Sequence, residues 1–284
     1  MMFIPVIAFF IVAKFAPMFG LVIAFKNYNF MEGILGSPWV GTRHFEMLFS
    51  LPQTTRIIKN TFIISVLTVV VAFPFPILLA IMLNEVRRSW FKRGVQTLVY
   101  LPHFFSWVIV GGMVVTLFSQ QSSWINTLIT DWFGSPYPFL YKEGSWLAIF
   151  LGSGIWKDSG FACIIYLAAI SAIDPTLYEA SSMDGAGKWR QIWHVTLPGM
   201  APTIVLILIL SLGNVMEVGF DKIYVLQNSV IAISEVISTY IYKAGLLGAQ
   251  FSAAAAMGLF ESLVGFILVL TANQIARKFN RGLW

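Results

Sequence analysis

The sequence predicts an all-α membrane protein with six transmembrane helices, and three observations support this fold class. Only 11% of the 284 residues are charged whereas 58% are hydrophobic, which is the balance of a membrane protein and not of a soluble domain. Several apolar runs reach the length of about 20 residues that a helix needs to cross a hydrocarbon core of about 30 Å. Inside a bilayer each backbone group must be satisfied within its own segment, so runs this long indicate helices.

The whole chain, residues 1–284, is interpreted as a single transmembrane domain. Its first residues lack the basic start and the small-x-small cleavage site of a signal peptide, so they are expected to open the first span. Pro74 and Pro76 are expected to kink the second span. The six expected spans cover residues 2–25, 56–83, 95–118, 145–173, 201–219 and 252–276.

Basic residues indicate how the spans are oriented. The densest groups lie in the loop after the second span and in the C-terminal tail: Arg87, Arg88, Lys92 and Arg93, and Arg277, Lys278 and Arg281. Loops rich in lysine and arginine stay in the cytoplasm, so both groups are assigned to that side. With six spans, both termini and the polar segment, residues 174–200, are then cytoplasmic as well. The net charge of +5 is attributed to this topology, and no nucleic-acid partner is expected.

The polar segment carries the local signals of two short helices. Asp174 offers a capping oxygen and Pro175 fits the first helical position, so a helix is expected to start there. Gly185 is a suitable left-handed stop. A second helical piece is expected over 188–195, and it should end before Pro198 because the residue before a proline disfavours the helical region. The segment is thus predicted to be two helices hinged at Gly185.

The same segment contains a spaced motif. It reads Glu179-Ala180-Ser181, three residues, Gly185, nine residues, and then Val195-x-Leu197-Pro198. This spacing resembles the EAA loop of permease subunits in binding-protein-dependent ABC importers, where Glu-Ala-Ala, Gly and Ile-x-Leu-Pro stand at the same intervals. Ser181 and Val195 are conservative departures that leave the register intact. An ordinary cytoplasmic hairpin packed on its own bundle is the plain alternative, and several positions in register argue against it.

The resemblance implies a fold and a set of partners. It implies a permease of the type I ABC importer kind, in the bacterial cytoplasmic membrane, with a cytoplasmic coupling helix that docks into an ATP-hydrolysing subunit. Two ATPase subunits, a second permease in a homologous heterodimer and a solute-binding protein would complete the complex, with ATP and Mg bound only by the partner subunits. Matched by position, the coupling residues would be Glu179, Ala180, Ser181, Asp184, Gly185, Val195, Leu197 and Pro198.

Motifs for catalysis or cofactor binding are missing from the sequence. Residues 185–188 (Gly-Ala-Gly-Lys) lack the first glycine of a phosphate-binding loop, and Trp189 stands where that loop requires Ser or Thr. The histidines and the single cysteine, Cys163, show no metal-ligand spacing. The chain is therefore predicted to be a transport subunit and not an enzyme, to bind no cofactor or metal itself, and to draw its energy from a partner.

Polar and aromatic residues within the spans are candidates for a substrate path, because such groups usually face a bundle interior or a wet cavity. Asn214, Glu217 and Asp221 are spaced by three and four residues, which places them on one face of a helix. The candidates from other spans are Trp107, Lys157 and Glu261. Other interpretations stay open: an interfacial aromatic belt for Trp107, helix–helix hydrogen bonds for Asn214 and Glu217, and the outer surface for Asp221.

Beyond the motif, stretches such as 24–30 (AFKNYNF) and 91–107 (FKRGVQTLVYLPHFFSW) resemble the polysaccharide or oligosaccharide branch of the family, close to alginate importer permeases. This resemblance implies import of a saccharide by alternating access, from an outer binding protein to the cytoplasm. The carboxylates of a polyuronate would need a cation such as Lys157, whereas Glu217 and Glu261 indicate a mixed path. The alternative is an ion-coupled secondary transporter or channel subunit that works through the two glutamates. It would ideally show inverted repeats, and the sequence has none that is visible.

Overall fold

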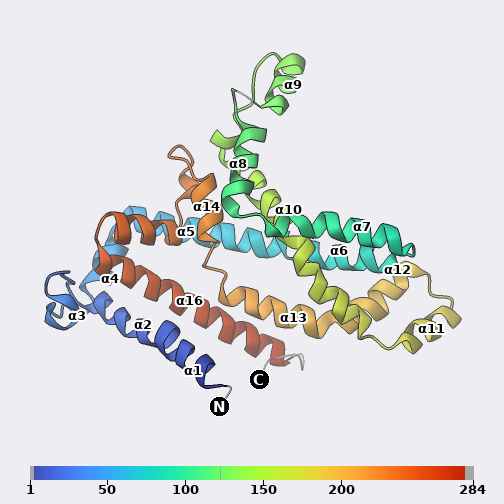
Figure 1. Cartoon of the computed structure of the whole chain (residues 1–284), viewed down its shortest axis with the longest axis horizontal. Helices are drawn as coiled ribbons and strands as arrows, with labels where there is room; N and C mark the ends of the chain where they lie inside the picture. The colour runs from blue at the N-terminus through green and yellow to red at the C-terminus, as the bar shows by residue number, and fades with distance from the viewer. Residues whose placement is uncertain (1–2, 122, 279–284) are drawn as a thin grey trace.

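The structure is a computed structural model, and it describes residues 3–121 and 123–278. Helices account for most of these residues, and an isolated bridge between Lys26 and Trp39 is the only strand-like pairing among them. The bundle extends along one axis, with α3 (Gly33–Gly36) and α4 (Arg43–Ser50) at one end and α11 (Pro175–Met183) at the other (Figure 1). This architecture agrees with the predicted all-α membrane class.

Within the described residues, five helical segments are long and apolar enough to span a membrane. In chain order they comprise α1 (Ile4–Phe10), η1 (Ile11–Phe15), α2 (Ala16–Met18) and η2 (Phe19–Phe25); α5 (Pro52–Leu67), η3 (Thr68–Ala72) and α6 (Pro74–Glu85); α10 (Glu143–Ser171); α12 (Lys188–Gln191), η6 (Ile192–Thr196) and α13 (Leu197–Gly213); and α16 (Phe251–Lys278). The first, second, fourth and sixth predicted spans differ from these segments by only a few residues at each end.

The third predicted span, residues 95–118, is wrong as one continuous helix. The chain instead forms α7 (Ser89–Tyr100) with η4 (Leu101–Phe104), and then α8 (Trp107–Phe118), bent by 101° at the break. Pro102 lacks the N–H of a regular helix, and Ser106 is extended and starts α8 by accepting the Ile109 N–H at 3.4 Å. If this bent pair is counted as one span, the described part of the chain has six.

The expected helix end before Pro198 is also wrong. The helix runs without a break from α12 through η6 into α13. η6 is a π turn, in which the Leu197 N–H donates to the carbonyl oxygen of Ile192, five residues back. A π turn of this kind accommodates a following proline, because the hydrogen bonds there no longer follow the i−4 pattern that the ring obstructs. The same device precedes Pro74, where η3 lies between α5 and α6.

The fifth span ends earlier than predicted, at Gly213 instead of residue 219. Asn214 and the residues after it form turns, Gly219 has a φ of +72°, and α14 (Phe220–Leu226) begins only after it. The expectation that Asn214, Glu217 and Asp221 share one helical face is therefore wrong. Glycine and asparagine are the residues that most readily end a helix, which accounts for the stop at Gly213 and Asn214.

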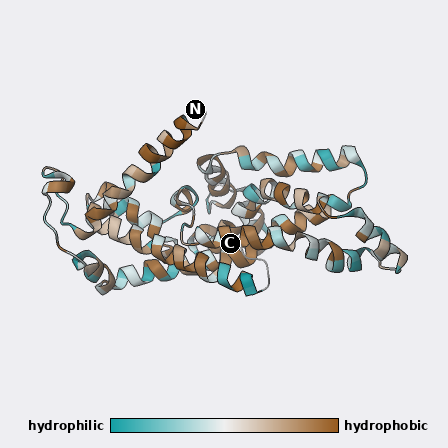
Figure 2. Cartoon of the chain, turned by 90° about the horizontal axis from the view of Figure 1, so that it is seen from below, coloured by the Kyte–Doolittle hydropathy of each residue, from teal (hydrophilic) through white to brown (hydrophobic). Residues whose placement is uncertain are grey.

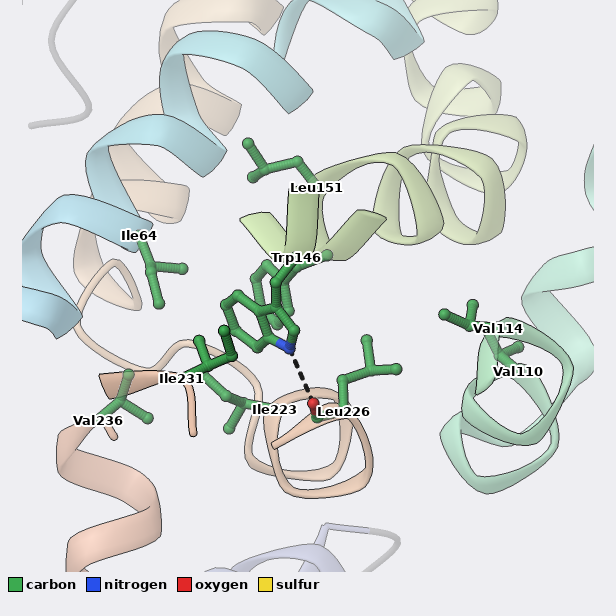
Figure 3. Packing of buried hydrophobic residues seen from close by; sticks show 10 residues of the cluster. Ile64, Val110, Val114, Trp146, Leu151, Ile223, Leu226, Ile231 and Val236 are labelled. Carbon is green, nitrogen blue, oxygen red and sulfur yellow. Dashed lines mark hydrogen bonds between the residues drawn. The ribbon is translucent and has the colours of Figure 1, made fainter. Parts of the chain in front are cut away.

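The outer connections of the bundle also contain short helices. They are α9 (Trp124–Phe133), η5 (Phe139–Tyr141), η7 (Ala232–Ser234), α15 (Ile237–Tyr240) and η8 (Ile241–Leu247). Trp146 of α10 is 1% exposed, and its indole N–H donates to the carbonyl oxygen of Leu226 at 2.8 Å (Figure 3). Ile223 and Leu226 belong to the same buried cluster as Trp146. α14 is therefore fixed against α10 by both packing and a hydrogen bond.

The first span contributes almost none of its apolar surface to the core of this chain. Its most apolar window is 0% buried, and it projects from the bundle with hydrophobic residues along it (Figure 2). A contiguous apolar surface of this size requires a cover of lipid or of another protein.

Candidate functional site

The start of α11 is defined by Asp174. Its side-chain oxygen accepts a hydrogen bond from the Thr176 backbone N–H at 2.9 Å, and Pro175 is the first helical residue. Hydrogen bonds from the backbone and then the side chain of Thr176 lower the pKa of Asp174, because they favour the charged carboxylate. The predicted helix start is confirmed.

Gly185 ends α11 in the left-handed conformation, with a φ of +77°. The Ala186 N–H donates to the Ser181 carbonyl oxygen at 2.9 Å, and the Gly185 N–H donates to the Ser182 carbonyl oxygen at 3.0 Å. These two bonds form a Schellman motif. The prediction of two helices joined at Gly185 is confirmed in geometry, although the second one continues into the next span.

Gln191 and Tyr178 brace α11 against the base of the fifth span. The Nε2 of Gln191 donates to the Oγ of Ser182 at 2.8 Å and to that of Ser181 at 3.2 Å. The hydroxyl groups of Tyr178 and Thr196 share a hydrogen bond of 3.0 Å. Sequence reasoning missed Gln191, because nothing in its neighbourhood in the sequence indicates that it is buried. A displacement of α11 would reach α13 through these contacts.

A second attachment joins α12 to the end of α6. The Nζ of Lys188 lies 3.0 Å from the Oε2 of Glu85. Between the two elements is a cavity of about 620 Å³, which Arg87 and Glu179 also line. The polar segment is thus tied to the end of the second span, a contact that the sequence did not indicate.

The outer face of α11 is free for another protein. Glu179, Ala180, Asp184 and Gly185 are exposed, while Ser181, Val195 and Leu197 are half-buried and Pro198 is exposed at the start of α13. Large apolar side chains that sequence reasoning missed stand beside them: Leu177, Met183 and Trp189 are 53%, 90% and 76% exposed. Glu179 has no hydrogen bond or ion pair with any residue that the structure describes. Exposed apolar groups around an unpaired carboxylate are typical of a contact surface.

Lys157, Lys222 and Trp107 meet at the break between α7 and α8, and we call this group the lysine cluster. Lys157 and Lys222 are only 6% and 8% exposed. Their Nζ atoms lie 5.4 Å and 5.3 Å from the centre of the Trp107 ring, within the range of cation–π attraction. The sequence predicted Trp107 and Lys157, but it missed Lys222.

The two ammonium groups of the lysine cluster have few hydrogen-bond acceptors. Lys157 donates to the carbonyl oxygen of His103 at 2.9 Å and lies 3.6 Å from the carboxylate of Asp158. Lys222 instead lies 3.8 Å above the ring of Phe150. Among the described residues no carboxylate lies within ion-pair distance of Lys222, so its charge faces aromatic rings and, farther away, the carboxylate of Asp158.

Asn214, Glu217 and Glu261 meet in a different place, a cavity of about 420 Å³ that we call the acidic cavity. The end of α13, η8 and α16 form it, and Ser238 and Tyr242 contribute to its lining. Asp221 lies outside this cavity, exposed in the first turn of α14. The structure therefore divides the predicted path residues between two neighbouring groups.

These features define the class of the protein as a helical, multi-span membrane protein with an exposed helix available for a partner. A model of the family described as "Binding-protein-dependent transport system inner membrane component" matches residues 72–283. The chain belongs to this family, and its homologues are the non-catalytic permease subunits of ABC transporters. The resemblance found in the EAA motif is confirmed, and the alternative of an ion-coupled secondary transporter or channel subunit has no support.

Relatives match the chain over nearly its full length. The polygalacturonan/rhamnogalacturonan transport system permease protein YteP of Bacillus subtilis (strain 168) is 46% identical over 98% of this chain and 87% of its own length. Protein LplB of the same organism is 39% identical over 99% of this chain and 89% of its own length.

Solved structures agree with these relatives. A bacterial ABC transporter involved in the import of the acidic polysaccharide alginate matches with a TM-score of 0.90 and 42% identity, over 98% of this chain and 94% of that one. A bacterial alginate ABC transporter in complex with alginate pentasaccharide-bound periplasmic protein matches with a TM-score of 0.91 and 41% identity, over 99% of this chain and 94% of that one.

Proposed function

We propose that this chain is the membrane-spanning subunit of an ATP-driven importer that carries an acidic oligo- or polysaccharide into the cytoplasm. Coupling to ATP hydrolysis is inferred from one observation: α11 is exposed, ends at Gly185 and is held to the next span by hydrogen bonds from Gln191. A contact there would move α13 and, through Lys188 and Glu85, α6. Substrate would then pass by alternating access as the spans reorient.

The coupling residues and partners follow from that surface. Glu179, Ala180, Asp184 and Gly185 would contact an ATPase subunit, with Ser181, Val195, Leu197 and Pro198 shaping the segment and restarting the span. Two ATPase subunits that bind ATP and Mg, a second permease, which we take to be a homologous heterodimer partner, and a solute-binding protein would complete the complex. Residues 1–284 would form one transmembrane domain in the bacterial cytoplasmic membrane, with both termini and α11 in the cytoplasm.

The lysine cluster supports an acidic substrate. Carboxylates of a sugar acid require cationic partners, and two buried ammonium groups beside Trp107 supply charge and a ring on which a sugar can stack. YteP is described as a permease for polygalacturonan or rhamnogalacturonan, and the first solved transporter as involved in the import of alginate; all of these polysaccharides contain sugar acids. Asn214, Glu217 and Glu261 would line the same path in the acidic cavity, and Asp221 would lie at its outer rim.

The test is ATP hydrolysis by the assembled complex, with oligouronates or neutral oligosaccharides presented on the binding protein. We expect oligouronates to stimulate hydrolysis. Lys157→Gln and Lys222→Gln should each raise the oligouronate concentration for half-maximal stimulation about tenfold, since each removes a charge-assisted contact. Lys59→Gln, which changes an exposed lysine of α5, is the matched control. Stimulation by neutral sugars alone, or equal responses in all three variants, would contradict the assignment to acidic saccharides.

A further inference from the structure

α14 separates two environments of opposite charge. On one side Lys222 extends to Trp107 and Phe150, in the lysine cluster. On the other side Phe220 lies against Tyr242, with ring centres 5.1 Å apart, and both line the acidic cavity. Residues two apart on a helix point in nearly opposite directions, since each step turns it by about 100°. A helix of about two turns therefore presents a cation to the lysine cluster and an aromatic ring to the acidic cavity.

The acidic cavity has a chemistry that the lysine cluster lacks. Its described lining contains the carboxylates of Glu217 and Glu261 and no lysine, arginine or histidine. The Oε1 of Glu261 and the Oγ of Ser238 are buried without a hydrogen-bond partner in the described part of the chain. A sugar carboxylate would be repelled here, whereas the hydroxyl groups of an uncharged sugar could donate to both glutamates.

The shape of the cavity also suits a sugar ring. Its volume of about 420 Å³ is at the lower end of small-molecule sites, which range over roughly 300–1,000 Å³. The rings of Phe220 and Tyr242 line it and can contact the apolar C–H side of a sugar, and Glu217, Ser238 and Glu261 line the same cavity. Few convergent polar groups beside an apolar face are the usual composition of such a site.

We infer that the acidic cavity is a second saccharide site, specific for an uncharged sugar unit. The inference rests on the proposed saccharide transport and narrows its substrate to oligosaccharides that contain both acidic and uncharged units. Trp146 and the packing of Ile223 and Leu226 hold α14 against α10, so the two sites keep a fixed spacing (Figure 3). Sugar acids bind at the lysine cluster, and an uncharged neighbour in the same oligosaccharide binds across α14.

The experiment compares two probes on the complete complex, using stimulation of ATP hydrolysis as the measure. One probe is an oligogalacturonate pentamer, and the other is a pentamer in which galacturonate alternates with an uncharged sugar. The quantity of interest is the ratio of their half-maximal concentrations, because contributions from the binding protein cancel when variants are compared. Glu261→Gln should raise the half-maximal concentration of the alternating probe about tenfold relative to that of the all-acidic probe.

Two further variants complete the test. Ser238→Ala removes a hydroxyl that makes no hydrogen bond within the described chain, so the fold is unaffected and a loss of about threefold for the alternating probe is expected. Asp131→Asn changes an exposed acid on the distant α9 and should leave the ratio unchanged. Two results would overturn the second site and leave the saccharide proposal standing. One is a ratio that neither Glu261→Gln nor Ser238→Ala changes, and the other is a wild-type complex that responds only to the all-acidic probe. A complex that responds to neither probe overturns the saccharide proposal with it.

Discussion

Replacing Gly185 by alanine tests whether the geometry of α11 sets its contact with the ATPase subunit. A Cβ at Gly185 would meet no atom within 4 Å, so the substitution introduces no clash. Its φ of +77° lies instead in the left-handed region, which costs an L-residue about 1–2 kcal/mol. If docking needs this conformation, that cost weakens the association with the ATPase subunit by between about fivefold and thirtyfold.

Gly187 provides a matched control two residues away. A Cβ at this position would also meet no atom within 4 Å, but the φ of −69° is open to any residue. Gly187→Ala should therefore bind like the wild type, and Gly185→Asn should recover part of the loss because asparagine tolerates the left-handed region. The assay is titration of the purified ATPase subunit onto the permease pair in nanodiscs. Equal affinities for the two alanine variants would refute the reasoning.

Three further predictions concern the support of the coupling segment and the bundle. Lys188→Glu should weaken coupled ATP hydrolysis slightly, by about 0.2–1 kcal/mol, which is the usual contribution of an exposed ion pair. Adding Glu85→Lys should restore it. A double-mutant cycle without restoration would show that this ion pair does not contribute to coupling. Gly160→Ala would press a Cβ into a backbone carbonyl of α7 and should lower the free energy of unfolding by about 1–3 kcal/mol. Gly152→Ala should not, because a Cβ there would meet no atom within 4 Å. Thermal melts in detergent distinguish the two variants. The pKa of Asp174 is lowered in the folded chain, so its capping stabilises α11 above the ordinary carboxyl pKa and is lost as pH falls through the folded value. The protection of α11 amides, measured as exchange relative to the unfolded-chain rate at the same pH, should fall over that range. In Asp174→Asn this protection should change less with pH.

The sequence predicted the features whose causes are local. Asp174 caps the helix that follows it, and Gly185 adopts the left-handed stop, because capping and positive φ depend on neighbouring residues. The spans were found by their length and apolarity. The break at Ser106 was missed because hydropathy averages over a window, and the residues around it are mostly apolar.

The candidate site was likewise predicted only where the signal was local in the sequence. Trp107 and Lys157 stood out as polar or aromatic residues within spans, but Lys222 lies in an outer connection by sequence. Only the packing of α14 on α8, of which Trp107 is the first residue, brings it to that ring. The shared face expected for Asn214 and Asp221 failed because regular helix geometry was extended past a helix end.

The π turn η3 (Thr68–Ala72) contains one residue more than a regular α turn, so the second span holds an extra residue without rotating the side chains that follow it. Ile57 and Ile64 are buried before it, and Pro76 and Leu83 are buried after it. In an uninterrupted α-helix the second pair would point about 100° away from the first, the rotation of one residue. Because the wide turn absorbs that residue, Pro76 and Leu83 keep the rotational register of Ile57 and Ile64 about the helix axis, and both stretches are buried. Deleting one residue within η3 should then convert the turn to regular α-helix. The residues before and after it should stay buried, so this span could be one residue shorter and still pack against the same helices.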